Sequence, residues 1–461
     1  MRLWFPVGAF KGRHFVELGG AILRGDLKHV RRRLSTFAAR VKRRPKTRSL
    51  NATIALLERE DWSRQASFGV SNVGQTRKRG EFAGDVSTLV TCQQAKRLRL
   101  VVDHAIGGGA NLYRQEFVEA SMASGCGVLL LTYDDLANLY VVTALVSDRR
   151  ADFHCSSLKG LRKLFQQLPP DEVVYNNIAS YPDPLEILTL LEELTDRSST
   201  LTILIHDYLP VCPSYNLIGA NGSFCSIPSE SECRKCLPVN RFADKGRQID
   251  IAEWRVAWRR ILTKSTFITC FSSASRAWLE RAYPEQMCKV KIHPHKPPEP
   301  FPRHPKLALE QPLHIGVVGT ITHAKGLHIV EQLAEFMCHQ DPEARLTIVG
   351  DVSKPLSAHN LNITGRYDRR DLPYIFERHG INVCLFPSIW PETYSYVVDE
   401  IMALKVPLCC FELGAPAERV RCYVSGRTIA STTAIAAYKM ALLTHKACNR
   451  PIAPNHRKNA R

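Results

Sequence analysis

The chain has 461 residues, enough for two domains of ordinary size and an extension. Its 45% hydrophobic and 23% charged residues are typical of a globular protein. No uncharged apolar run approaches the roughly 18 to 20 residues that a membrane-spanning helix needs, which argues against an integral membrane protein. The sequence lacks a convincing signal peptide and its cysteines are scattered through apolar segments, so we expect a cytoplasmic protein with reduced thiols.

The formal charge of +18 is concentrated in residues 1–50, which hold fourteen Lys and Arg against two acidic residues. Within residues 20–48, apolar side chains recur every three or four positions, which predicts a basic amphipathic helix. Such a helix suits the anionic surface of the inner membrane, and the alternative is that it packs on the protein with its basic face in solvent. Nucleic acid is not an expected partner, because no aromatic platform or recognition module accompanies the charges. We treat residues 1–92 as an extension.

A first α/β domain is predicted over residues 93–292. An apolar strand ends at Asp103 and runs into a turn formed by Gly107, Gly108 and Gly109, after which a helix is expected. Glycines let the backbone approach a ligand closely, and a helix that starts after them can bind phosphate. The turn is not a dinucleotide fingerprint, because three consecutive glycines do not match the G-x-G-x-x-G spacing.

Strands are then expected near 127–133, 172–175, 201–206 and 267–271, with helices between them, which predicts a parallel, doubly wound sheet. His206 ends the third of these strands, and Asp207 follows it. Ligands bind at the carboxyl edge of such a sheet, so both residues are candidate site residues.

Four cysteines, Cys212, Cys225, Cys233 and Cys236, lie in the loop after His206. Four thiolates in one loop could hold a structural zinc ion, although only one Cys-x-x-Cys pair is present, and the alternative is free or redox-labile thiols. A catalytic metal is not expected, because no histidine or open-site pattern accompanies them.

A proline-rich linker is predicted at 293–312, because proline cannot continue a helix or donate to a strand ladder. A second α/β domain follows at 313–445, and a basic tail at 446–461. This domain opens with a strand, a turn at Gly319 and Thr320, and Lys325, a compact cation placed where a diphosphate would lie.

A second candidate site lies between a strand predicted at 381–386 and a helix predicted at 397–404. Glu392 stands in the loop and Glu400 inside the helix, eight residues later. The backbone N–H groups at the helix start suit an anion, and they belong to Thr393, Tyr394 and Ser395.

These segments together resemble the retaining glycosyltransferases of family 4, which have the GT-B fold. The resemblance rests on the Glu-x7-Glu spacing of Glu392 and Glu400, the His206-Asp207 segment and Lys325-Gly326. It covers residues 93–445 and implies two doubly wound Rossmann-like domains facing across a cleft. The chain departs from the family pattern at three positions, having Thr320 where many members have Arg, Ile401 where they have Ala and Lys405 where they have Gly.

The resemblance also implies roles for individual residues. Glu392 and His206 would meet the donor sugar, Glu400 the ribose and Lys325 the diphosphate. The nucleotide base would lie near Gly365 and Arg366.

The implied reaction is transfer of a sugar from a UDP- or GDP-sugar to a hydroxyl of a glycan or lipid-linked acceptor, with retention of anomeric configuration. The implied setting is bacterial O-antigen, capsule or exopolysaccharide synthesis. No Asp-x-Asp motif stands in a suitable loop, so no metal cofactor is expected for catalysis. Two alternatives stay open: a catalytically inactive GT-B subunit that binds or scaffolds, and a Rossmann-type oxidoreductase, which the missing nicotinamide fingerprint disfavours.

Overall fold

The computed structural model describes residues 62–65 (backbone only), 88, 94–196, 200–243, 246 and 248–449, all within one compact unit that spans Asp61–Arg461. The predicted basic helix at 20–48 and the tail beyond residue 449 lie outside the described residues. Among the helices described, none is long and apolar enough to cross a membrane.

The first sheet is built from nine described strands in the order β1-β5-β4-β3-β2-β6-β7-β8-β9. Their bounds are β1 Trp62–Gln65, β2 Leu98–Val102, β3 Gly127–Asp134, β4 Leu139–Val146, β5 Arg149–Cys155, β6 Glu172–Tyr175, β7 Thr200–Ile205, β8 Phe267–Cys270 and β9 Val290–Ile292.

The sheet is parallel from β3 through β2 to β9, as predicted from the alternation of strands and helices. The other edge of the sheet was not predicted: β4 and β5 form an antiparallel hairpin on β3, and β1 pairs antiparallel with β5. The hairpin closes through a two-residue turn at Ser147, whose φ is 53°. Such a turn needs left-handed backbone, and Ser-Asp is a weak sequence signal for it. Because β1 joins this sheet, the first domain takes a strand from the segment treated as an extension.

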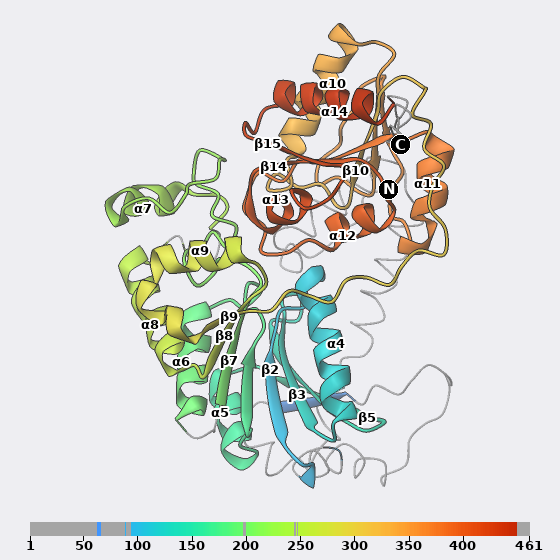
Figure 1. Ribbon diagram of the computed structural model, residues 1–461. Coiled ribbons are helices and arrows are strands. Elements are labelled where there is room, and N and C mark those ends of the chain that lie inside the picture. The colour runs from blue at the N-terminus through green and yellow to red at the C-terminus, as the bar shows by residue number, and fades with distance from the viewer. Residues whose placement is uncertain are drawn as a thin grey trace, which may run out of the picture. The chain divides into compact units, whose positions relative to one another are not determined.

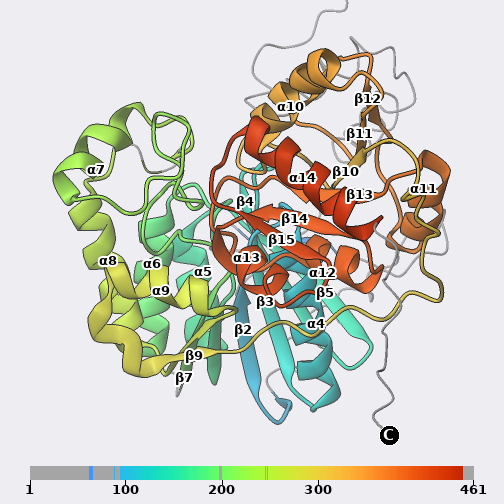
Figure 2. The same cartoon turned by 45° about the horizontal axis from the view of Figure 1, so that its top comes forward.

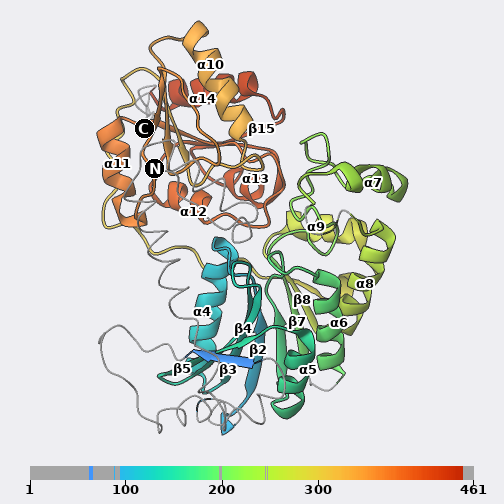
Figure 3. The ribbon, with the colours of Figure 1, turned by 180° about the vertical axis from the view of Figure 1, so that it is seen from behind.

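Helices cover both faces of the first sheet. The chain moves one way along the sheet from β2 to β3 and the other way from β6 to β9, so right-handed crossovers place α4 on one face and α6 and α8 on the other (Figures 1 and 3). The helix bounds are α4 Gly109–Ala123, α5 Leu158–Gln167, α6 Pro184–Thr195, α7 Glu230–Cys236, α8 Ile251–Lys264 and α9 Ser273–Ala282.

The second sheet has six described strands, all parallel, in the order β12-β11-β10-β13-β14-β15 (Figure 2). The strand bounds are β10 His314–Val318, β11 Arg345–Val349, β12 Leu361–Ile363, β13 Val383–Phe386, β14 Leu408–Phe411 and β15 Gly426–Ile429. The helix bounds are α10 Leu327–Gln340, α11 Leu372–His379, α12 Tyr396–Ala403, α13 Gly414–Val420 and α14 Ala434–Cys448.

Each face of the second sheet buries a separate apolar cluster. One cluster packs side chains of α10 and α14 on the strands, and the other packs those of α11, α12 and α13. The central strands β10, β13 and β14 are fully buried on both faces of the sheet, which explains their continuous apolar sequences. Two doubly wound Rossmann-like sheets, the arrangement of the GT-B fold, are therefore confirmed.

Candidate functional site

Each of the two sheets has a point at which the chain reverses the direction in which it adds strands. In open α/β folds, ligands bind at the carboxyl edge beside such a point. In the first sheet this point lies between β2 and β6, and in the second between β10 and β13. The loops after β10 and β13 carry Lys325 and Glu392, and the loop after β7 carries His206. Lys325 and Glu392 therefore flank the reversal point of the second sheet, and His206 lies at the carboxyl edge of the first sheet, one strand away from its reversal point.

Lys325 and Glu392 are brought together by close packing of their loops. Ile389 N–H donates to Ala324 O at 3.0 Å, and Gly326, with φ 79°, passes so near Pro387 that a Cβ would lie 2.0 Å from its carbonyl oxygen. Lys325 Nζ consequently lies 3.9 Å from Glu392 Oε1.

Glu392 is a buried carboxylate, 4% exposed. Its backbone is fixed, because its N–H donates to Trp390 O and its carbonyl accepts from Ala415 N–H. Oε1 has no hydrogen-bond partner among the described residues. A buried carboxylate oxygen that lacks a hydrogen bond is costly, so Glu392 is suited to a ligand that donates one.

The segment after Glu392 turns into α12. Ser395 caps the helix by accepting from Val398 N–H at 3.4 Å, and Thr393 Oγ1 donates to His206 O at 2.7 Å. Within the described chain, the N–H groups of Thr393, Tyr394 and Ser395 have no acceptor. They provide donors at the positive end of a helix dipole.

His206 is held as a neutral imidazole. Burial lowers its pKa well below the ordinary value, with smaller contributions from His295 and His104. Asn176 Nδ2 donates to Ala110 O at 3.1 Å, so Asn176 Oδ1 accepts from His206 Nε2, which lies 2.9 Å away. This assignment leaves His206 Nδ1 as an acceptor.

Asp207 is occupied by contacts within the first domain. Its carboxylate accepts from Asn177 Nδ2 at 2.7 Å and from Leu209 N–H at 2.9 Å, and burial raises its pKa to about 6. These contacts fix the loop after β7, which indicates a positioning role for Asp207.

The glycine turn of the first domain has positive φ at Gly107 and Gly108, and a Cβ at either residue would meet open space. At Gly109 a Cβ would lie 3.2 Å from the ring of Tyr396, at the start of α12. Asn111 Oδ1 accepts from Gly107 N–H at 2.6 Å, which fixes the turn. The turn thus borders the same loop of the second domain as His206 does.

Glu400 lies on α12 beside a cation that sequence reasoning missed. Arg369 Nε lies 3.4 Å from Glu400 Oε1, and its guanidinium stands 4.1 Å over the ring of Phe301. Burial nevertheless raises the pKa of Glu400 to about 7, and Arg369 opposes that shift.

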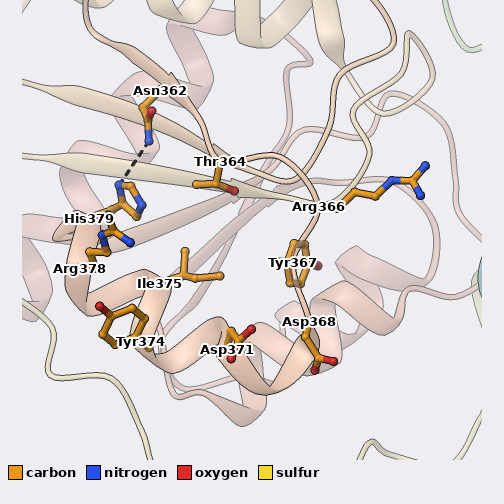
Figure 4. Close-up of a pocket in the computed structure, with 10 residues that line it drawn as sticks. All are labelled: Asn362, Thr364, Arg366, Tyr367, Asp368, Asp371, Tyr374, Ile375, Arg378 and His379. Carbon is orange, nitrogen blue, oxygen red and sulfur yellow. Dashed lines mark hydrogen bonds between the residues drawn. The ribbon is translucent and has the colours of Figure 1, made fainter. Parts of the chain in front are cut away.

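The residues predicted near the nucleotide base lie further along the same edge of the second sheet. Gly365 has positive φ. Gly319, which also has positive φ, and the exposed Thr320 belong instead to the turn after β10, where the diphosphate was predicted. Arg366 is 83% exposed and lies 3.2 Å from Asp351. A pocket of about 570 Å³ adjoins Gly365 (Figure 4). Its lining residues are mostly polar and come from β12, η4 (Arg369–Asp371), α11 and the turn between them: Asn362, Thr364, Arg366, Tyr367, Asp368, Asp371, Tyr374, Ile375, Arg378 and His379.

An aromatic cluster joins the two domains beside the loop that carries Glu392. His295, which we treated only as linker, stacks on Tyr394 with ring centroids 4.1 Å apart and contacts Phe271. Its Nδ1 lies 2.7 Å from Tyr396 OH. Burial, then Arg419 and His293, lowers its pKa to about 3. The sequence offered no signal for these contacts beyond the place of His295 between Pro294 and Pro297.

Residues 299–459 match the model of the family "Glycosyl transferases group 1". The match covers the second sheet with Lys325, Glu392 and Glu400, so this part of the chain is similar to that family. No curated protein sequence matches the chain.

Several solved structures are similar at low identity. HepE of Anabaena, in complex with UDP and glucose, is 14% identical over 77% of this chain and 90% of its own, with a TM-score of 0.46. Sucrose-phosphate synthase of Thermosynechococcus elongatus is 15% identical over 76% and 91%, with a TM-score of 0.48. The catalytic domain of starch synthase IV of Arabidopsis thaliana is 10% identical over 76% and 92%, with a TM-score of 0.46. The strand order described above, rather than this likeness, defines the fold.

Proposed function

We propose that the protein is a retaining glycosyltransferase that moves a sugar from a UDP- or GDP-sugar to a hydroxyl of a glycan or lipid-linked acceptor. The observation that carries the proposal is the buried Glu392 carboxylate, whose Oε1 lacks a hydrogen-bond partner in the described chain and lies 3.9 Å from Lys325 Nζ. A sugar hydroxyl would satisfy that oxygen, and a diphosphate would pair with the lysine.

In this mechanism the charge that develops on the diphosphate leaving group is met by donors already in place. Lys325 supplies one cation, and the N–H groups of Thr393, Tyr394 and Ser395 supply donors at the start of α12. Donors fixed before the reaction stabilise a developing anion without reorganisation. The proposal therefore requires no metal ion at the leaving group.

The remaining site residues orient the donor and the acceptor. Glu392 would accept from a hydroxyl of the sugar, and Glu400 from the ribose, with Arg369 holding the Glu400 carboxylate. His206, on the first domain, would accept a hydrogen bond at Nδ1 from a hydroxyl of the sugar or of the acceptor. We name no covalent nucleophile.

The Glu392 assignment is tested with Glu392→Gln, which keeps the size of the side chain. Its transfer rate should fall at least ~100-fold, as when a group that stabilises the transition state is lost. The rate is followed as nucleoside diphosphate released from a panel of UDP- and GDP-sugars, with a lipid-linked glycan fraction as acceptor. Glu335→Gln, an exposed position on α10, is the matched control. An unchanged transfer rate in Glu392→Gln would contradict the role assigned to Glu392.

We further propose that the basic segment at 20–48 holds the enzyme on the inner membrane surface, where lipid-linked acceptors of bacterial polysaccharide synthesis would lie. Each Lys or Arg near an anionic surface contributes about 1 kcal/mol. Replacing Arg31, Arg32 and Arg33 with Gln should therefore lower partitioning onto phosphatidylglycerol vesicles by up to ~100-fold. Three exposed basic residues elsewhere serve as the control when changed in the same way: Arg370, Lys439 and Lys446. Equal partitioning of both triple variants would contradict a role for the segment.

A further inference from the structure

The segment between the two domains buries one side chain, although the residues around it are open to solvent. His295 is 7% exposed, and it is the one buried residue of the described stretch 293–300. This stretch forms neither a helix nor a strand, and Pro294 and Pro297 restrict its backbone. Contacts of the ring itself must therefore account for the burial of His295.

The ring of His295 contacts both domains. In the first domain, the rings of Phe271 and Tyr113 meet it edge-on, with centroids 4.2 Å and 4.8 Å away. In the second domain, it stacks on Tyr394 with an angle of 13° between the planes, and its Nδ1 lies 2.7 Å from Tyr396 OH. Contacts of this kind between aromatic rings are favourable beyond the area that they bury. The side chain thus ties the start of α12 to the first domain.

The hydrogen bond to Tyr396 is the contribution that needs a histidine. Burial lowers the pKa of His295 to about 3 and raises the pKa of Tyr396, so both groups are uncharged at neutral pH. Among the described residues, the buried His295 Nε2 has no hydrogen-bond partner. An unpaired buried nitrogen costs stability, and a phenylalanine would keep the ring contacts without that cost. What histidine adds is therefore the bond between Nδ1 and the tyrosine hydroxyl.

The two tyrosines that His295 contacts flank the cap of α12. Tyr394 and Tyr396 stand on either side of Ser395, which caps the helix. The hydroxyl of Tyr394 also donates to Asp399, and the guanidinium of Arg419 stands 4.7 Å over its ring. The backbone N–H groups at this helix start, which the proposed transfer directs at the diphosphate, therefore lie among side chains that the imidazole holds in place.

We propose that His295 is a positioning residue of the donor site, which holds Tyr394 and Tyr396 so that the N–H groups at the start of α12 face the diphosphate. In this role the imidazole acts through the two tyrosines and does not touch the substrate. Because Phe271 and Tyr113 pack on the same ring, the first domain takes part in setting the donor site. The inference rests on the proposed function, since the diphosphate is the ligand that these N–H groups would meet.

The test is the affinity of the full chain for UDP and GDP, measured by isothermal titration well below the melting temperature of each variant. His295→Ala removes the stack and the hydrogen bond, so it should raise the Kd of the nucleotide at least about tenfold. His295→Phe keeps the ring and should raise the Kd only about threefold. His304→Ala, which changes an exposed histidine of the same segment, should leave the Kd unchanged. A role in folding alone would lower the melting temperature without this graded loss of affinity.

A second set of variants tests the hydrogen bond by itself, in case His295→Ala does not fold. Tyr396→Phe removes one hydroxyl and should raise the Kd about threefold, as His295→Phe does. The double variant His295→Phe/Tyr396→Phe should lose no more affinity than either single variant, because all three lack the same bond. Losses that add in the double variant would overturn the inference.

The unaltered chain distinguishes failure of the inference from failure of the proposed function. If it binds UDP or GDP and His295→Ala binds the same nucleotide equally well, the inference is overturned and the proposed function stands. If the unaltered chain binds neither nucleotide, both are overturned.

Discussion

At the scale of single residues, the site depends on backbone positions as much as on charged groups. Lys325 meets Glu392 because Gly326 lets its loop lie against Pro387, where a Cβ would be 2.0 Å from the carbonyl oxygen. A similar approach occurs at Gly414, where a Cβ would lie 2.5 Å from Glu392 O. Both glycines have positive φ, so conformation and space exclude larger residues at the same time.

Gly326→Ala should lower the free energy of unfolding by about 2–4 kcal/mol, because overpacking adds to the cost of left-handed backbone. It should also weaken nucleotide binding, since Lys325 is displaced. Gly380→Ala is the matched control, with φ 69° and only His314 Nδ1 at 4.0 Å. That variant should lose only about 1 kcal/mol. Equal losses in denaturant unfolding would show that the contact with Pro387 is unimportant.

At the scale of elements, α12 ends in a Schellman motif with a lysine, Lys405, at the left-handed position. Lys405 N–H donates to Met402 O and Val406 N–H to Ile401 O, the two bonds of a Schellman motif. Lys405 has φ 59° and is exposed. The family that the chain resembles usually has glycine here, so Lys405 departs from its pattern. The left-handed backbone explains why glycine suits this position.

Lys405→Gly should raise the free energy of unfolding by about 1 kcal/mol, because glycine adopts left-handed backbone without strain. The same change at Lys439, an exposed position inside α14, should lower it by about 1 kcal/mol, because glycine is unfavourable within a helix. Denaturant unfolding followed by circular dichroism separates the two. Destabilisation by Lys405→Gly would contradict the account of this helix end.

Most elements around the site could be predicted from local sequence. The strand and helix expected at 381–386 and 397–404 are β13 Val383–Phe386 and α12 Tyr396–Ala403. A buried parallel strand is a continuous apolar run, and that signal is local. The β4–β5 hairpin was missed because its turn lacks the usual Asn-Gly or Asp-Gly pair.

Partners that lie far apart in the sequence could not be predicted in the same way. Arg369 approaches Glu400 across 31 positions, and no periodicity links the two. His295 meets Tyr394 and Tyr396 only once both domains are formed.

At the scale of the whole described unit, the two domains are joined at the edges that carry the site. Tyr208 OH donates to Pro391 O at 2.8 Å, next to Glu392. Glu418 on α13 accepts from Ser273 and Ala274 N–H, at the start of α9. A ligand that contacts Glu392 and His206 would therefore bind both domains at once.

The most direct test of this account is a thermal-shift screen of the purified chain against UDP, GDP, ADP, CMP and NADH, with and without EDTA. A ligand at a hundredfold excess over its Kd adds about 2.7 kcal/mol of stability, which is readily measured. We predict a shift with one nucleoside diphosphate that survives chelation. Lys325→Ala should weaken that binding about ten- to a hundredfold, the cost of one charge-assisted hydrogen bond, and Lys439→Ala should leave it unchanged. No shift with any nucleotide, or a shift with NADH alone, would contradict the assignment of a nucleotide-sugar site.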